Sequence, residues 1–94
     1  MPAMIVKHRV ANFEKWKATF DEMDPTRQAH GWTGYSLLRD ATDPNLIVIV
    51  NRMSDLGRAK AYGSSDALRT AMQNAGVLGV PEIQLLEDAE ERRY

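Results

Sequence analysis

One histidine occupies an unusual place in the first strand that the sequence predicts. From Met4 to Val10 the side chains alternate between two faces, and His8 shares its face with Met4, Val6 and Val10. If this face packs against helices, the imidazole is buried. Desolvation and the neighbouring side chains can then tune the pKa of His8 near neutrality. Such a histidine could move a proton to or from a bound molecule. The alternative is a core histidine that hydrogen-bonds a backbone carbonyl.

Trp16 and Asn51 are two further candidates. Trp16 lies on the apolar stripe of the following helix with Phe13 and Phe20, where an indole can wall a cavity for a flat ligand. The same spacing also describes an ordinary hydrophobic core, which is the commoner case. Asn51 ends a strand face and could orient a carbonyl or a peroxide, or equally bond the turn before Ser54.

Two phenols and a thioether complete the candidate site. Tyr35 and Tyr62 could donate hydrogen bonds to an enolate or phenolate, although each also fits a rim position with a wet hydroxyl. Met72 could line a pocket flexibly, and Arg69 could hold an anion but more simply is solvated. We therefore predict catalytic roles for His8 and Asn51 and substrate-binding roles for Trp16, Tyr35, Tyr62 and Met72.

The first half of the chain predicts a strand, a broken helix and a second strand. Asn12 is a suitable N-cap for a helix that begins at Phe13, and Asp24-Pro25 interrupts this helix because proline cannot continue it. Asp24 is expected to cap a short second segment. Strand two is predicted from Trp32 to Arg39.

The second half predicts a hairpin, two short helices and a final strand. A turn at residues 43–45 joins strand two to strand three, which runs through residues 45–53. Ser54 and Ser64 are the expected caps of the two helices. Residues 76–81 read as a loop, the last strand as Glu82 to Leu86, and residues 87–94 as a charged tail of a single domain spanning residues 1–94.

This order of elements predicts an α+β fold, a ferredoxin-like βαββαβ arrangement with a four-stranded antiparallel sheet. Strand three is apolar on both sides, with Leu46, Val48 and Val50 on one and Ile47 and Ile49 on the other. Helices can cover only one face of such a sheet. We therefore expect a homodimer in which a second copy covers the other face.

Composition excludes several classes of function. The 94 residues contain no cysteine, which rules out disulfides and thiolate metal sites and fits a cytoplasmic protein. Twelve basic and thirteen acidic residues give a net charge of −1, so nucleic acid is not an expected partner. The longest apolar run, residues 46–50, is too short to span a membrane. Two histidines and the absence of nucleotide or metalloprotease motifs predict neither a metal nor a cofactor.

The stretches VKHRVANFEKWKATFD, GYSLLRDATDPNLIVIV and AGVLGVPEI resemble the dimeric α+β barrel superfamily, which includes the antibiotic biosynthesis monooxygenase-like proteins. The resemblance spans about residues 5–86 and implies two ferredoxin-like sheets forming a barrel, with a ligand cavity between each sheet and its own helices. The superfamily hosts cofactor-free oxygenases, polyketide cyclases and isomerases. Its cofactor-free oxygenases use an asparagine followed closely by a tryptophan, whereas Arg52 and Met53 follow Asn51 here.

The sequence therefore leaves three hypotheses of function. The first is a cofactor-independent cyclase or isomerase that acts on a hydrophobic or aromatic, polyketide-like small molecule, with His8 as the acid or base. The second is a non-catalytic ligand-binding or stress-associated protein. The third is a cofactor-free monooxygenase.

Overall fold

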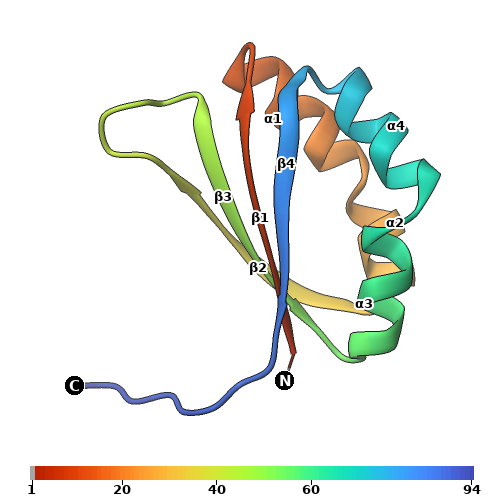
Figure 1. Ribbon diagram of the computed structural model, residues 1–94, viewed down its shortest axis with the longest axis vertical. Helices are drawn as coiled ribbons and strands as arrows, with labels where there is room; N and C mark the ends of the chain where they lie inside the picture. The colour runs from red at the N-terminus through yellow and green to blue at the C-terminus, as the bar shows by residue number, and fades with distance from the viewer. Residues whose placement is uncertain (1) are drawn as a thin grey trace.

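The computed structural model describes residues 2–94, which form one four-stranded sheet and four helices. The strand order is β2-β3-β1-β4 and every neighbouring pair is antiparallel, so the predicted ferredoxin-like α+β fold is confirmed (Figure 1). The elements in chain order are β1 (Ala3–Val10), α1 (Phe13–Glu22), α2 (Asp24–Ala29), β2 (Trp32–Arg39), β3 (Leu46–Met53), α3 (Leu56–Gly63), α4 (Asp66–Asn74) and β4 (Val77–Leu86).

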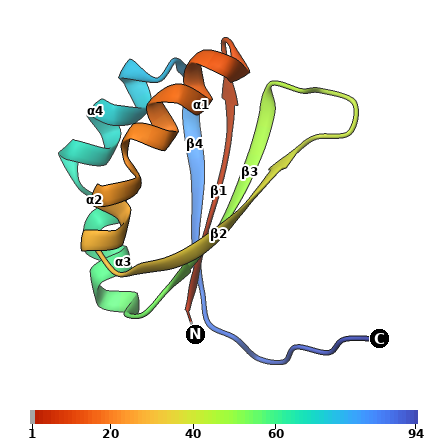
Figure 2. The same ribbon diagram turned by 180° about the vertical axis from the view of Figure 1, so that it is seen from behind.

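All four helices lie on one face of the sheet, as the two opposite views in Figures 1 and 2 show. Alternation along β1 and β3 turns one set of side chains toward the helices, and these residues form most of the core. Ile47 and Met53 on β3 are 0 % exposed, and Val10 on β1 is 1 % exposed. The inner face of these two strands is therefore the floor on which any site between sheet and helices is built.

Helix α1 begins and ends close to where the sequence predicts. Asn12 caps it by accepting a hydrogen bond from the Lys15 backbone N–H at 3.0 Å. The break comes after Glu22, but the N-cap of α2 is Met23, and Asp24 is the first helical residue with a proline directly after it. The prediction that Asp24 caps α2 is therefore wrong, and Pro25 occupies the first turn, where a missing N–H costs nothing.

The caps of α3 and α4 are each one residue later than predicted. Asp55 rather than Ser54 caps α3, and its carboxylate accepts from the Gly57 N–H at 2.7 Å. Ser65 rather than Ser64 caps α4. The backbone conformation determines which residue is the N-cap. Asp55 and Ser65 have the extended conformation of an N-cap, while Ser64 is the C-cap of α3.

Strand β4 is longer than predicted, because residues 77–81 are strand rather than loop. Its pairing with β1 slips between Lys7 and Arg9, whose partners are Glu82 and Leu78. Gly79, at φ +72°, lies inside this irregularity. The turn-forming residues of this segment are thus accommodated in a β-bulge, and the bulge lies opposite His8.

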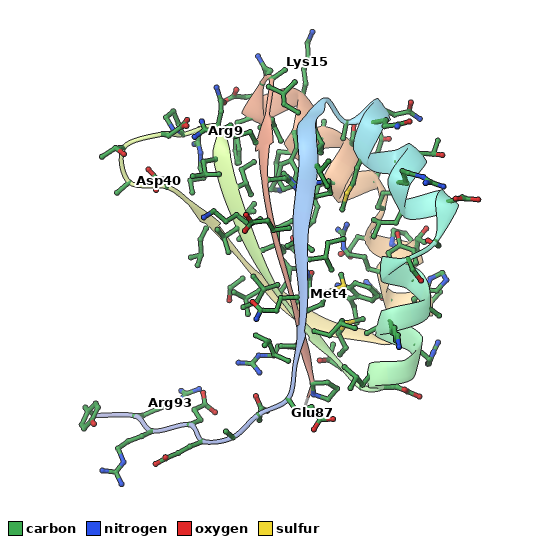
Figure 3. All side chains as sticks on the ribbon, viewed as in Figure 1. Met4, Arg9, Lys15, Asp40, Glu87 and Arg93 are labelled. Atoms are coloured by element: carbon green, nitrogen blue, oxygen red, sulfur yellow. The ribbon has the colours of Figure 1, made fainter. Side chains whose placement is uncertain are left out.

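No helix formed by residues 2–94 covers the outer face of the sheet (Figures 1 and 2). Leu38 and Leu78 on this face are 52 % and 53 % exposed, and the outward apolar side chains of β3 are half-buried. Residues 87–94 form neither helix nor strand and extend away from the sheet, as the positions of Glu87 and Arg93 show (Figure 3). The apolar outer face is consequently open within the single chain.

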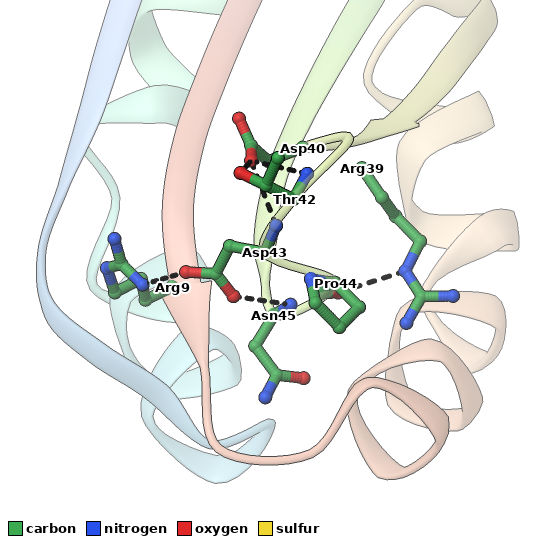
Figure 4. A network of polar contacts seen from close by, with 7 residues as sticks. All are labelled: Arg9, Arg39, Asp40, Thr42, Asp43, Pro44 and Asn45. Carbon is green, nitrogen blue, oxygen red and sulfur yellow. Dashed lines mark hydrogen bonds and ion pairs between the residues drawn. The ribbon is translucent and has the colours of Figure 1, made fainter.

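The β2–β3 loop is held by a network of side chains (Figure 4). The Asp40 carboxylate accepts from the Thr42 hydroxyl at 2.8 Å and from the Thr42 and Asp43 backbone N–H groups, and these bonds lower its pKa. Arg9 pairs with Asp43 of the same chain. No helix within residues 2–94 is long and apolar enough to cross a membrane.

Candidate functional site

A cavity of about 70 Å³ lies between the inner face of the sheet and the helices. Every helix and three of the four described strands contribute to its wall, which is mostly apolar. The wall includes His8 of β1, Trp32 of β2, Asn51 of β3, Trp16 and Phe20 of α1, Arg27 of α2, Tyr62 of α3, and Leu68 and Met72 of α4. A cavity that binds benzene measures about 150 Å³, so a ligand of that size must displace flexible side chains such as Met72.

His8 is the most unusual side chain of this cavity. It is 5 % exposed, and neither Nδ1 nor Nε2 has a hydrogen-bond partner among residues 2–94. Most buried polar side-chain atoms in folded proteins are hydrogen-bonded, and leaving one unpaired costs about 1–3 kcal/mol. A core histidine bonded to a backbone carbonyl is therefore not what the structure contains.

Burial also changes the charge state of this imidazole. Desolvation lowers the pKa of His8 from 6.5 to about 4, because the apolar surroundings disfavour the cation. The sequence led us to expect a pKa near neutrality, and that expectation is wrong. At neutral pH His8 is uncharged and offers one N–H donor and one acceptor nitrogen.

Trp16 and Phe20 extend from His8 as a row of rings. The His8 and Trp16 ring centroids are 5.5 Å apart in an edge-on arrangement, and Trp16 stacks on Phe20 at 4.8 Å. Trp16 is 3 % exposed, so it belongs to the core and also to the cavity wall. The two interpretations of Trp16 are therefore compatible, and the row gives the cavity an aromatic, apolar wall.

Asn51 is buried and fully engaged with other parts of the protein. Its Oδ1 accepts from the Trp32 indole N–H at 2.8 Å, and its Nδ2 donates to the Met4 carbonyl at 3.0 Å. It does not bond the turn before Ser54. Although Asn51 lies at the cavity wall, its amide is committed to holding Trp32 and β1. Trp32 itself was not singled out by the sequence, because the pair joins residues nineteen positions apart.

The remaining predicted residues lie at different depths. Tyr62 is 5 % exposed and lines the cavity, and burial raises the pKa of its phenol, which keeps it protonated. Met72 lines the cavity from α4 and is half-buried. Tyr35 is 39 % exposed and meets Phe20 edge-on at 5.0 Å, which places it beside the aromatic row rather than inside the cavity.

Arg27 is a cavity residue that sequence reasoning missed. It is 6 % exposed, and its guanidinium carbon lies 3.8 Å from the centre of the Phe20 ring. The signal was present, because Arg27 continues the three- and four-residue spacing of Phe13, Trp16, Phe20 and Met23 across the helix break. A charged residue at a position of the apolar stripe is a candidate for a buried role.

A second, larger groove of about 450 Å³ lies between α4 and the bulged part of β4. Leu68 and Met72 line both hollows, so these two side chains form the wall between them. Arg69 lines the groove but pairs with Asp66 at the surface, and it does not reach the cavity. Within residues 2–94 no group of three or more potential metal ligands gathers at one place.

Comparisons with known proteins identify the fold. No family model matches the chain, and no curated protein matches it. Solved structures do match, and three are described here. An antibiotic biosynthesis monooxygenase has 17% identity and a TM-score of 0.71, over 96% of this chain and 100% of that chain.

The other two come from named organisms. SnoaB from Streptomyces nogalater, described as a cofactor-independent oxygenase, has 13% identity and a TM-score of 0.76, over 96% of this chain and 94% of its own. Rv0793 from Mycobacterium tuberculosis has 14% identity and a TM-score of 0.67, over 99% and 100% of the two chains. The chain thus has the fold of the antibiotic biosynthesis monooxygenase-like proteins, as its resemblance to them implied. At these identities the likeness concerns the fold alone.

The two buried polar residues His8 and Asn51 should respond oppositely to the same substitution. His8→Leu removes two unpaired polar atoms, so we expect the free energy of unfolding to rise by about 1 kcal/mol. Asn51→Leu leaves the Trp32 N–H unpaired, and we expect a loss of about 2 kcal/mol. Urea unfolding at pH 7 measures both. Equal destabilisation by the two variants would mean that His8 is an ordinary packing residue.

His8 should also make stability depend on pH. Its pKa in the folded state, about 4, is below the 6.5 of the unfolded chain, so the unfolded chain binds more protons between these values. The free energy of unfolding therefore falls as the pH drops through this range, by about 2 kcal/mol between pH 7 and 5. When His8→Leu is unfolded over the same pH series, its free energy of unfolding should not show this decrease. Parallel curves for the two proteins would contradict the buried, neutral imidazole.

Proposed function

We propose that this protein binds a hydrophobic or aromatic small molecule in the cavity, and that His8 transfers a proton within it, as in a cofactor-independent cyclase or isomerase. The observation that carries the proposal is the imidazole of His8, which is buried at the cavity wall with both nitrogens unpaired. Unsatisfied buried polar groups are costly, and a catalytic or binding role is one reason why a protein retains them. The flat row of Trp16 and Phe20 suits an aromatic ligand.

The proposed step is a proton transfer with balanced charge. Neutral His8 takes a proton from an acidic C–H or O–H of the ligand, and the electron pair remains on the ligand as an enolate or phenolate. The imidazolium then returns the proton to another atom, which completes an isomerisation. In a cyclisation the enolate carbon attacks a second carbonyl, and the imidazolium protonates the resulting alkoxide.

The negative charge formed on the ligand makes this step feasible for a weakly basic imidazole. A pKa of about 4 belongs to the imidazole among its apolar neighbours, where desolvation opposes the cation. An adjacent anion favours the protonated form and raises the pKa. The protonated phenol of Tyr62, which also lines the cavity, can donate to the enolate oxygen. We assign Met72 to the adaptable wall, Tyr35 to the rim and Asn51 to positioning Trp32.

Two other functions each have one observation in their favour. The small size of the cavity, about 70 Å³, together with the low pKa of His8, favours a binding protein without catalysis. The description of SnoaB as a cofactor-independent oxygenase favours oxygen chemistry. Against the latter, the Asn51 amide is already bonded at both ends inside the protein. An oxygenase would consume oxygen in the presence of a reduced aromatic substrate.

We further propose that two copies of the chain pair through the outer faces of their sheets. This face is lined by apolar side chains of all four described strands, including Ile5, Leu38, Val48 and Leu78, and none of the described helices covers it. Exposed apolar surface of this extent marks an interaction site. A second copy presents the same apolar surface and buries both faces at once. Arg9, by contrast, is already paired with Asp43 within the chain, so we do not assign it to a cross-dimer ion pair.

Acetophenone tests the proton transfer, because it is flat and its methyl protons are weakly acidic. In heavy water, removal of a methyl proton followed by return of a deuteron labels the methyl group, which proton NMR follows. We expect the protein to accelerate exchange at least about 100-fold over buffer, and His8→Leu to bind acetophenone without accelerating it. Shifts of cavity-lining backbone amides report binding. Equal exchange rates for the two proteins would overturn the role of His8, and a ligand that does not bind would overturn the site itself.

Sedimentation velocity tests the dimer. We expect a dimer at micromolar concentration and a monomer for the Leu38→Lys, Val48→Lys double variant, because two charges per chain would have to be buried in the interface. Ala18→Lys adds a charge on the exposed side of α1 and serves as the control, which should remain dimeric. A wild-type protein that sediments as one chain at this concentration contradicts the proposal.

A further inference from the structure

We propose that the cavity selects an aromatic ligand that carries a carboxylate, and that Arg27 binds this carboxylate. The inference rests on the proposed function for the location of the ligand and goes beyond it by naming the chemical class. It depends on the charge of Arg27, on the absence of an acid from the cavity wall and on the geometry that links Arg27 to His8.

Arg27 is a buried cation whose charge is incompletely compensated. The side chain is 7% exposed, and its ion pair is a single contact from Nη2 to Asp24 Oδ1 at 3.3 Å. Asp24 is 46% exposed, and its other oxygen accepts from Gln28 at 2.9 Å. The Arg27 Nε is buried and has no partner. A buried guanidinium normally has its donors satisfied, because an unpaired buried charge is strongly unfavourable.

The cavity wall offers the Phe20 ring to the Arg27 guanidinium but no acidic side chain that would neutralise its charge. Among the described residues that line it, Arg27 is the one with a formal charge at neutral pH, and no aspartate or glutamate is present. His8 and Tyr62 are the other titratable groups of the wall, and burial keeps both neutral. An apolar cavity with one cation and no anion is electrostatically suited to a ligand with one negative charge.

The position of Arg27 relative to His8 indicates a flat ligand with polar groups at two ends. The guanidinium lies over Phe20 at 3.8 Å, Phe20 stacks on Trp16 at 4.8 Å, and Trp16 meets His8 at 5.5 Å. A flat, extended ligand laid along this row would have the guanidinium toward one end and the imidazole toward the other. Arginine is particularly suited to a carboxylate, because its planar fork donates two parallel hydrogen bonds.

A purely structural role for Arg27 makes a different prediction. Arg27 lies in the last turn of α2, where a cation interacts favourably with the helix C-terminus. In that case the charge serves the helix, and the cavity should not distinguish an anion from a neutral ligand of the same shape. Comparing a carboxylate with its amide therefore separates the two roles.

Benzoate and benzamide are the matched probes, since they share ring and shape and differ in charge. We expect the intact protein to bind benzoate at least about tenfold more tightly than benzamide, measured at pH 7 by NMR titration of cavity-lining amides. Arg27→Met keeps an apolar stem and removes the charge, so it should abolish the preference while benzamide still binds. Arg27→Lys keeps the charge without the fork and should retain part of it. Arg69→Met, at the surface, is the control and should leave the preference unchanged.

Each outcome bears on one proposal. Equal affinities of the wild-type protein for benzoate and benzamide would overturn the carboxylate site and leave the proposed ligand cavity intact. A preference that survives in Arg27→Met would overturn it as well. Binding of neither probe, together with failure to bind acetophenone, would instead overturn the cavity as a ligand site. If circular dichroism shows that Arg27→Met does not fold, the carboxylate site is still tested by the preference of the wild-type protein for benzoate over benzamide and by its partial loss in Arg27→Lys.

Discussion

The constraint on which the site depends is the cost of keeping polar atoms in a layer without water. His8 and Arg27 carry the three buried side-chain polar atoms of residues 2–94 that have no hydrogen-bond partner, and both residues line the same cavity. Each such atom lowers stability by about 1–3 kcal/mol, which is a large part of what a domain of this size has in reserve. The contrast is with Asn51, an equally buried polar residue whose amide is bonded at both ends. The protein can therefore satisfy buried polar groups, and the two it leaves unsatisfied lie where a ligand could reach them.

The fold determines that these two residues meet. Strand alternation turns His8 inward along with its apolar neighbours, because a one-residue shift of register would expose the whole set. The break after Glu22 lets α2 start anew while the spacing of the apolar stripe continues, so Arg27 falls on the cavity side of its helix. Opposite His8, the bulge in β4 interrupts the ladder. The bulge also borders the second groove. Leu68 and Met72 line both this groove and the cavity, so their side chains form the wall between the two.

Local patterns predicted the architecture well because strand alternation and helix spacing are local. The element order, the hairpin of β2 and β3 and the Asn12 cap all follow from them. The caps shifted by one residue because Ser54 and Asp55 are chemically equivalent candidates, and only the backbone conformation selects between them. Residues 77–81 were mistaken for a loop because glycine and proline suggest a turn, whereas here the bulge accommodates them. The Trp32–Asn51 bond and the burial of Arg27 are tertiary facts that no local pattern contains.

The same physics that makes His8 a weak base among its apolar neighbours makes it responsive to the ligand. Desolvation opposes an isolated imidazolium, which is why the pKa falls to about 4. A ligand that gives up a proton creates an anion beside the new cation, and in a low-dielectric cavity this attraction is stronger than it would be in water. Arg27 adds a second cation that already lacks full compensation, so negative charge on the ligand is favoured before any proton moves. One event is thus favoured by the whole arrangement, the appearance of negative charge on a bound ring. The unpaired imidazole and the undercompensated guanidinium lower stability by themselves, and this negative charge would give both a partner.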